Sequence, residues 1–270
     1  MMNEALVKKI KQLPPLPESA FAIEAVYQNP NSNFNDMVRI LEKDPLLTAD
    51  ILKAANSPLY GFSREINAIS QAVSLFGMGT VRGFALASIV KKSFSLDLSP
   101  YGISSTIFSS LSKKQHALMI AWCLKREPKL MGVLSPAAFL VEIGKVLISQ
   151  QIIADKSQLI FRDTLKATQN VEESERKVVD TDTSEVSSSI FEHWRFEEGL
   201  VNVIQNCTKP DQAEPEYQKA AQILHVIRAT FTLNAQITKE SLEKAKELIA
   251  EYQLDLESYE KALELLNDVD

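Results

Sequence analysis

The sequence predicts an all-α protein, and three observations support that fold class. Apolar residues recur at helical spacing along almost the whole chain of 270 residues. No two apolar runs are joined by the short Asn-Gly or Asp-Gly turn that is typical of a β-hairpin. The chain also has only 8 glycines, well below the roughly 7% of an average protein, which disfavours a glycine-rich β-protein.

Composition excludes several functional classes. The glycine-rich phosphate loops of P-loop and Rossmann enzymes are absent, because the nearest match, residues 76–81, is followed by Arg82 at the third glycine position. With 29 basic and 35 acidic residues the net charge is −6, so no nucleic acid partner is expected. The 3 histidines could supply one histidine-based metal site at most.

The chain is predicted to be cytoplasmic, with no membrane association. Its first residues do not have the pattern of a signal peptide. The most apolar stretch, residues 130–149, contains Pro136, Glu142 and Lys145, so it is predicted to be a buried helix rather than a membrane span. The 2 cysteines lack C-x-x-C spacing, and we expect them to be buried free thiols.

Residues 1–95 are predicted to form an N-terminal subdomain of short helices. Three prolines in residues 13–17 make that segment a stiff extended turn, because each ring fixes its own φ and restricts the residue before it. Asp44 and Pro45 mark the end of one helix and the start of another, since Asp caps an N-terminus and Pro suits the first helical position. The predicted helices cover residues 20–29, 34–43, 45–55, 68–77 and 81–91, with caps at Asn33 or Asn35, Asp44, Asn67 and Thr80.

A change of composition at residues 93–102, where Ser, Asp, Pro and Gly interrupt the apolar pattern, predicts a boundary between subdomains. A second helical subdomain is expected over residues 96–212, and residues 213–270 should pack on it or extend it. The predicted helices cover residues 107–124, 136–146, 158–168, 183–194, 197–206, 216–233, 241–252 and 256–266.

Three local signals define parts of this second region. Ser135 followed by Pro136 repeats the pattern of a cap and a first-turn proline, which predicts a helix start there. Asp182 with Glu185 resembles a capping box for a helix that reaches Trp194. Residues 172–184 are polar and charged, and they fit either a loop or a weak helix.

Several blocks of this sequence, in order, resemble the HDOD domain. The matching blocks are residues 13–17, 40–48, 51–57, 69–77 and 81–82, and the resemblance covers roughly residues 10–210. It implies an all-α module of bacterial signalling that has short N-terminal helices. It also implies a second half similar to the HD-type metal-dependent phosphohydrolases, usually without their metal ligands.

The HD-type enzymes hold a divalent metal with a His, a His-Asp dyad and a later Asp. By this resemblance, His116 matches the first ligand, whereas Val141 and Glu142 stand at the dyad and Thr183 stands where relatives often carry His. The last carboxylate, expected near residues 228–230, is missing. His116, Glu142 and Thr183 are therefore candidates for a degenerate pocket, and we expect no metal, no cofactor and no catalytic residues.

Two sets of residues have simpler structural interpretations. Asp44, Pro45, Asn56 and Ser57 look like the family signature, and their chemistry favours caps and turns over a binding role. Glu142 lies in an otherwise apolar helix, and a buried carboxylate there needs a partner, for which Lys145 and His116 are the near choices.

Three functions remain after these exclusions. The first is a non-catalytic bacterial regulatory module that acts through contact with an unidentified signalling protein and can hold a ligand in the degenerate pocket. The alternative is a metal-dependent phosphohydrolase or phosphodiesterase that acts on nucleotides or cyclic dinucleotides. The third is a sensor that binds a small nucleotide without cleaving it.

Overall fold

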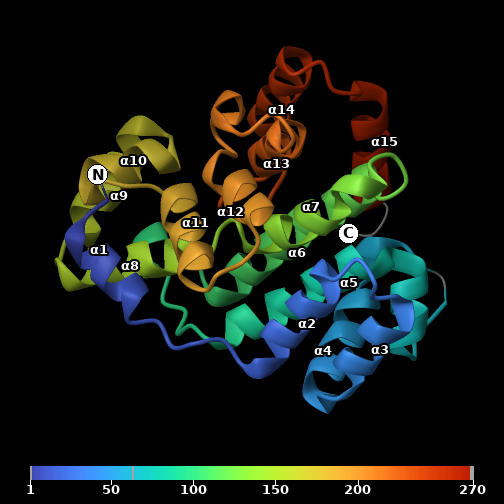
Figure 1. Cartoon of the computed structure of the whole chain (residues 1–270). Coiled ribbons are helices and arrows are strands. Elements are labelled where there is room, and N and C mark those ends of the chain that lie inside the picture. Colours follow the sequence, from blue (N-terminus) through green and yellow to red (C-terminus); the bar gives the residue numbers. More distant parts are fainter. Residues whose placement is uncertain (1, 63, 268–270) are drawn as a thin grey trace.

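The computed structural model describes residues 2–62 and 64–267, and every regular element in those ranges is a helix (Figure 1). This confirms the predicted all-α fold class. Single 3₁₀ turns lie at Pro58–Tyr60 (η1), Ser99–Tyr101 (η2), Pro128–Leu130 (η3) and Pro210–Gln212 (η4). The α-helices are α1 (Glu4–Lys11), α2 (Glu18–Gln28), α3 (Phe34–Glu42), α4 (Pro45–Ala55), α5 (Ile69–Lys92), α6 (Ser105–Cys123), α7 (Met131–Leu140), α8 (Gly144–Ala154), α9 (Gln158–Thr168), α10 (Val171–Val179), α11 (Thr183–His193), α12 (Glu198–Gln205), α13 (Gln218–Thr230), α14 (Lys239–Glu251) and α15 (Leu256–Asn267).

Local capping begins α3 and α4 where the sequence predicts. The side chain of Asn33 accepts a hydrogen bond at the start of α3, and the Asp36 side chain accepts one from the backbone N–H of Asn33, which completes a capping box. Asp44 Oδ1 accepts from the backbone N–H groups of Leu46 and Leu47, both at 3.0 Å. These bonds satisfy N–H groups that an α-helix leaves without internal partners.

The two helices predicted on either side of Gly77 are both present, but their predicted caps are wrong. Gly77 has φ 79° and ψ 162°, which breaks the helical path inside α5. Ala68, not Asn67, is the N-cap, and the Gln71 side chain accepts a hydrogen bond from the backbone N–H of Asn67. Thr80 lies inside the second helical stretch, where its hydroxyl is buried and has no hydrogen-bond partner among the described residues.

The predicted helix over residues 136–146 is wrong in its start and in its continuity. Pro136 lies inside α7, and a turn at residues 141–143 separates α7 from α8. A proline inside a helix leaves the carbonyl four residues earlier without its donor. Here that carbonyl belongs to Gly132, and Arg82 Nη1 donates to it at 2.8 Å, so tertiary packing compensates for the missing bond.

One helix, α1, lies outside the predicted set, and another, α10, is left open by the prediction. α1 covers the first residues, and its buried Leu6 and Ile10 pack it against α8 and α11. Residues 171–179 form α10, which decides between the loop and the weak helix left open above. Asn170 caps α10 by accepting from the backbone N–H of Glu173.

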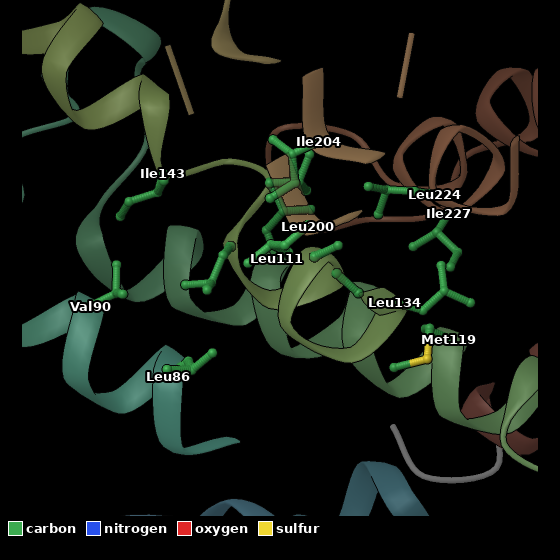
Figure 2. Packing of buried hydrophobic residues seen from close by; sticks show 14 of the residues in the cluster. Leu86, Val90, Leu111, Met119, Leu134, Ile143, Leu200, Ile204, Leu224 and Ile227 are labelled. Atoms are coloured by element: carbon green, nitrogen blue, oxygen red, sulfur yellow. The ribbon is translucent and has the colours of Figure 1, made fainter. Parts of the chain in front are cut away.

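One continuous apolar cluster extends through the described chain. α5 packs on α7, α6 packs on α7 and α15, and α8 packs on α11. Figure 2 shows side chains of this cluster converging from α5, α6, α7, α12 and α13. The labelled residues are Leu86, Val90, Leu111, Met119, Leu134, Ile143, Leu200, Ile204, Leu224 and Ile227.

The buried side chain of Arg82 connects four helices. It forms ion pairs with Glu24 of α2 at 2.6 Å and with Glu197, the N-cap of α12, at 2.7 Å. Its guanidinium also lies over the Tyr27 ring, 4.4 Å from the centroid. Together with the bond to the Gly132 carbonyl of α7, these contacts leave Arg82 fully buried but compensated.

Two helical stretches of the described chain pass a length and composition test for membrane spans. They are Ile69–Lys92 and Pro128–Ala154, and 61% and 89% of their apolar windows are buried inside the fold. Such burial is usual for the core helices of a soluble protein, which pass the same test.

Candidate functional site

A buried ion cluster forms around Glu142, in the turn between α7 and α8. Lys145 of α8 donates to Glu142 Oε2, and Arg228 of α13 donates to Oε1 at 2.8 Å. Arg228 also donates to Glu172 at 2.8 Å. Of the two partners expected for a buried Glu142, Lys145 is therefore confirmed and His116 is not. Arg228 is a second partner that was not predicted.

Thr183, the first residue of α11, joins this ion cluster to a second carboxylate. Its hydroxyl accepts from Lys145 Nζ at 3.0 Å and donates to Glu175 at 2.6 Å. Tyr101 also donates to Glu175, at 2.7 Å. Lys145, Thr183, Glu175 and Tyr101 are all buried, and the hydrogen bonds among them compensate for the lost hydration of each group.

The charges of the ion cluster follow from its contacts. Burial alone would raise the pKa of Glu142, but Arg228 and Lys145 beside it hold that pKa well below its ordinary value. Burial likewise opposes the charge on Arg228, whereas Glu142, Cys207 and Glu172 raise its pKa well above the usual range. Glu142, Lys145 and Arg228 are therefore charged in the folded protein.

Glu175 behaves differently from Glu142. Burial raises its pKa, Lys145 opposes that change only in part, and the negative charge of Glu172 adds to it. Two carboxylates in one buried network thus have pKa values shifted in opposite directions, because Glu142 faces two cations and Glu175 faces hydroxyls and one more distant cation, at 3.9 Å.

Glu142, Lys145 and Arg228 line a cavity of about 840 Å³, together with residues of α10, α13 and α14. This volume is within the range of roughly 300–1,000 Å³ that is common for small-molecule sites. Although the chain is acidic overall, the cavity lining has one more cation than carboxylates. Its cations are Lys145, Arg176, Lys209, Arg228 and Lys244, and its carboxylates are Glu142, Glu172, Glu173 and Glu240.

Gln115 of α6 also lines this cavity. Its Nε2 donates to Glu142 Oε1 at 3.3 Å, which fixes the orientation of the amide because the opposite orientation would bring two acceptors together. Its Oε1 is buried and accepts no hydrogen bond among the described residues. Gln115 is thus a residue that the sequence analysis missed, with an acceptor that is still unsatisfied.

His116 lies on a different face of α6 and is not part of the cavity lining. Tyr60 hydrogen-bonds its Nδ1 at 2.7 Å, and Ser135 hydrogen-bonds its Nε2 at 2.9 Å. The Ser135 hydroxyl donates to the Thr80 carbonyl, so it accepts from Nε2–H and leaves Nδ1 to accept from Tyr60. Successive helical residues point to different faces, which is why Gln115 and not its neighbour contacts Glu142.

The imidazole of His116 is a neutral group held by packing. It stacks on the ring of Phe139 with a centroid separation of 3.8 Å, and it is fully buried. Burial lowers its pKa well below the ordinary value. Both ring nitrogens have hydrogen-bond partners in the described structure, so His116 is available neither as a metal ligand nor as a base in this geometry.

The four signature residues lie at local structural features. Asp44 and Pro45 begin α4, as described above. The Asn56 side chain donates to the carbonyls of Leu52 and Ile66 and accepts from the backbone N–H of Ile66, which ties the end of α4 to the segment before α5. Ser57 precedes η1 and lines a second cavity, described below.

The residues around Glu142 do not fit a divalent metal ion. The described residues include no group of three or more His, Cys, Asp or Glu side chains placed to hold one. Both oxygens of Glu142 already face the cations Lys145 and Arg228, whose charges would repel a metal ion at the same carboxylate. No metal-dependent step follows from this geometry.

Of the two cavity residues that were not predicted, Arg228 has a recognisable signal in the sequence and Gln115 has none. Residues 226–231 contain no charged residue other than Arg228, just as residues 137–144 contain none other than Glu142, and a buried charge needs a partner of opposite sign. Gln115 gives no such signal, because a polar residue beside a histidine on a helix can as well face solvent.

Comparison with solved structures shows the same fold in several bacterial proteins. A candidate phosphohydrolase from Shewanella amazonensis is 23% identical, with a TM-score of 0.68 over 98% of this chain and 94% of the other. A virulence factor from Campylobacter jejuni is 27% identical, with a TM-score of 0.58 over 98% and 97%. A candidate signal transduction protein from Marinobacter aquaeolei is 22% identical, with a TM-score of 0.69 over 96% and 58%.

Sequence comparison gives a shorter match and a family. An uncharacterized protein of Treponema pallidum is 30% identical over 74 residues, which are 27% of this chain and 14% of that much longer relative. The sequence model of the HDOD domain matches residues 13–210, which are most of the chain. The matched region contains α2, α3 and α4 together with Glu142, Lys145 and Thr183. The chain therefore belongs to the HDOD domain family.

Proposed function

We propose that this chain is a non-catalytic regulatory module of bacterial signalling that acts through contact with another signalling protein in the cytoplasm. The observation that carries the proposal is the buried cluster of Glu142, Lys145 and Arg228. A metal-dependent phosphohydrolase needs a bound cation that lowers the pKa of a water molecule and neutralises phosphoryl charge. Here two fixed side-chain cations neutralise the one carboxylate that stands at the dyad position.

The same ion cluster supports a regulatory rather than a purely structural role for the cavity. Its charged side chains join the turn after α7 to α8, α10 and α13, and the Thr183 hydroxyl joins it to α11. A partner or ligand that alters the position of Arg228 or Glu172 would therefore act on several helices together. HDOD membership and the signal transduction protein among the structural neighbours are consistent with this proposal.

Metal content and hydrolysis together test the absence of catalysis. The purified chain should contain no stoichiometric Mn, Fe, Zn or Mg by elemental analysis. It should also release no product from a panel of nucleotides and cyclic dinucleotides with each metal added. One equivalent of metal, or hydrolysis, that disappears in Glu142→Ala but persists in Glu173→Ala would overturn the proposal in favour of a metal-dependent phosphohydrolase. Glu173 is a suitable control because it is a carboxylate of the same cavity that lies outside the buried ion cluster.

Affinity capture from the native cell tests the contact with a partner. The expected result is recovery of a signalling protein that binds the purified chain directly, with weaker binding to an Arg228→Met variant than to a Lys239→Gln variant. Lys239 is exposed and outside the cavity lining. Equal binding of the partner to both variants would contradict a regulatory role of the ion cluster.

A second candidate function, a sensor that binds a small nucleotide without cleaving it, is favoured by the chemistry of the same cavity. Lys209 and Lys244 line this cavity and form no ion pair among the described residues. Their ammonium groups suit the phosphate oxygens of a nucleotide.

Thermal unfolding with added nucleotides tests this sensor. A ligand that binds only the folded state raises the apparent unfolding temperature. The increase should disappear when Lys209 and Lys244 are both changed to Gln and should remain in Lys125→Gln, since Lys125 is exposed and lies outside the cavity lining. No increase with any nucleotide, or an equal increase in the double variant, would exclude this function.

A further inference from the structure

A second cavity, of about 480 Å³, lies between the short N-terminal helices and the helices after residue 102. One side is formed by α4, η1 and α5, and the other by α6, α7 and the turn that follows α7. Leu96, within the predicted boundary at residues 93–102, also belongs to the lining. None of the functions discussed above uses this cavity.

The walls of this second cavity are mainly apolar. Phe84, Phe108, Leu140 and Ile143 are buried side chains of the core, and the remaining apolar walls are only partly buried. The partly buried walls are Ala54, Tyr60, Ala87, Leu96 and Phe139. An apolar ligand that covers the partly exposed walls would remove that surface from water, which favours binding.

The rim of the second cavity is basic, in contrast to the acidic chain. Four lysines and one aspartate belong to its lining, namely Lys53, Lys91, Lys92, Lys113 and Asp50. Lys92 pairs with Asp50 at 2.7 Å, and Lys91 donates to the Ser109 hydroxyl at 2.6 Å. Lys53 and Lys113 form no ion pair among the described residues, so at least two positive charges at this rim are not neutralised by the protein.

The lysines at the rim also repel one another. Burial lowers the pKa of Lys91, and the positive charges of Lys113 and Lys53 lower it further, against the opposing effect of Asp50. An anion that binds between like positive charges offsets their mutual repulsion, and this lowers the free energy of the complex. The apolar walls and the basic rim therefore require an apolar body and an anionic head in the same ligand.

We propose that the cavity between α4, α5, α6 and α7 binds a small amphiphilic anion, with an apolar chain or ring among Phe84, Phe108 and Phe139 and a carboxylate or phosphate head at Lys91 and Lys113. Such a ligand would contact both sides of the predicted subdomain boundary. It would also contact Tyr60, whose hydroxyl hydrogen-bonds His116. This proposal does not depend on the function proposed for the Glu142 cavity.

Calorimetric titration of the purified chain with decanoate, below the concentration at which it forms micelles, tests this proposal. Decanoate should bind at one site per chain. Decanol, which has the same chain without the charge, should bind at least about tenfold more weakly, as expected for loss of a charge-assisted contact. Changing Lys91 and Lys113 together to Gln should weaken decanoate binding by a similar factor, whereas Lys125→Gln with Lys129→Gln, two exposed lysines outside the cavity lining, should not.

A variant that fills the second cavity gives an independent readout. Ala87→Phe on α5 should abolish decanoate binding, and Ser74→Phe, at an exposed position of the same helix, should leave it unchanged. Circular dichroism checks that each variant keeps its helix content, and the lysine variants decide the outcome if Ala87→Phe does not fold. Decyl phosphate compared with decanoate identifies which anionic head is preferred.

The proposal is overturned by any of three results. These are no saturable binding of decanoate or decyl phosphate, equal binding of decanol and decanoate, or equal loss of binding in the two lysine double variants. Binding to vesicles of anionic lipid without binding to either single-chain anion would also overturn it, because a membrane surface would then be the ligand.

Discussion

At the scale of single residues, the chemistry of the Glu142 cavity depends on which charged groups are buried together. Glu142, Lys145 and Arg228 are each nearly inaccessible to solvent, and Glu142 forms an ion pair with each of the two cations. A buried pair contributes little net stability compared with an apolar replacement, but removing one partner leaves a costly unpaired charge. The consequences of substitution in the ion cluster therefore depend on which charge remains.

Glu142→Gln is expected to lower the free energy of unfolding by about 3–5 kcal/mol, because Lys145 and Arg228 would remain buried with one carboxylate fewer. Urea unfolding followed by circular dichroism measures the change. The control is Glu173→Gln, which removes an exposed ion pair with Lys177 and should cost no more than about 1 kcal/mol. Equal losses in both variants would show that the ion cluster is not buried as described.

His116 predicts a dependence of stability on pH. Its pKa in the folded protein is well below the value of 6.5 for the free side chain, so the unfolded chain binds a proton first as the pH falls. This contribution is fully present above pH 6.5 and decreases below it, by up to about 1.4 kcal/mol per pH unit. His116→Gln should reduce that slope, as measured by urea unfolding between neutral and mildly acid pH.

Tyr60→Phe is the matched control for the His116 prediction. It removes the hydrogen bond to Nδ1 but keeps the imidazole buried against Phe84 and Phe139. Its slope of stability against pH should stay close to that of the unchanged protein, because desolvation is the cause of the lowered pKa of His116. A slope that is unaltered in His116→Gln would contradict the predicted linkage.

At the scale of helices, the breaks depend on contacts made elsewhere in the molecule. The turn between α7 and α8 brings Gly144 against the start of α11, where its backbone N–H donates to Ser187 Oγ at 2.8 Å. A Cβ at residue 144 would come within 2.5 Å of the Thr183 carbonyl oxygen. Glycine is therefore needed there for the close approach of two helices, and that approach places Lys145 beside Thr183.

Gly144→Ala should lower the free energy of unfolding by about 1–3 kcal/mol, the usual cost of overpacking a well-packed interior. Thr183 O is a backbone atom, so the strain cannot be relieved by a side-chain rotation. Gly61→Asn is the comparison, since no atom lies within 4 Å of the added Cβ and Asn tolerates a φ of +66°. Chemical unfolding of the two variants separates a steric clash from a general effect of replacing glycine.

At the scale of the whole molecule, one apolar cluster and one buried arginine join the predicted subdomains. The cluster includes residues on both sides of residues 93–102. Arg82 of α5 bonds to α2, to α7 and to the N-cap of α12. The parts before and after the predicted boundary thus share buried contacts that neither could keep alone.

The chain is expected to unfold in a single cooperative transition. Circular dichroism reports the helices, and the fluorescence of Trp122 and Trp194, which are both buried, reports tertiary packing. The two probes should give the same midpoint in urea. Two separated transitions, or a midpoint for fluorescence that differs from that for helix content, would show that the subdomains unfold independently despite Arg82.

The sequence alone determines the features that depend on near neighbours. Asn33 and Asp44 start helices because their side chains reach N–H groups two or three residues away, and the apolar period predicts most of the other helices without knowledge of the fold. The need of Glu142 for a partner also follows from its apolar surroundings in the chain. The resemblance to the HDOD domain, read from short blocks, is confirmed over residues 13–210.

Only the tertiary structure decides the features that depend on distant residues. Arg228, which completes the Glu142 ion cluster, is 86 residues away from Glu142 in sequence. Packing of α6 also decides that Gln115, and not His116, faces Glu142. The same holds for the break before Gly144 and for the second cavity, between α4, α5, α6 and α7. Local hydrogen bonds are specified by spacing along the chain, whereas buried charges and cavities arise from the way helices distant in sequence pack together.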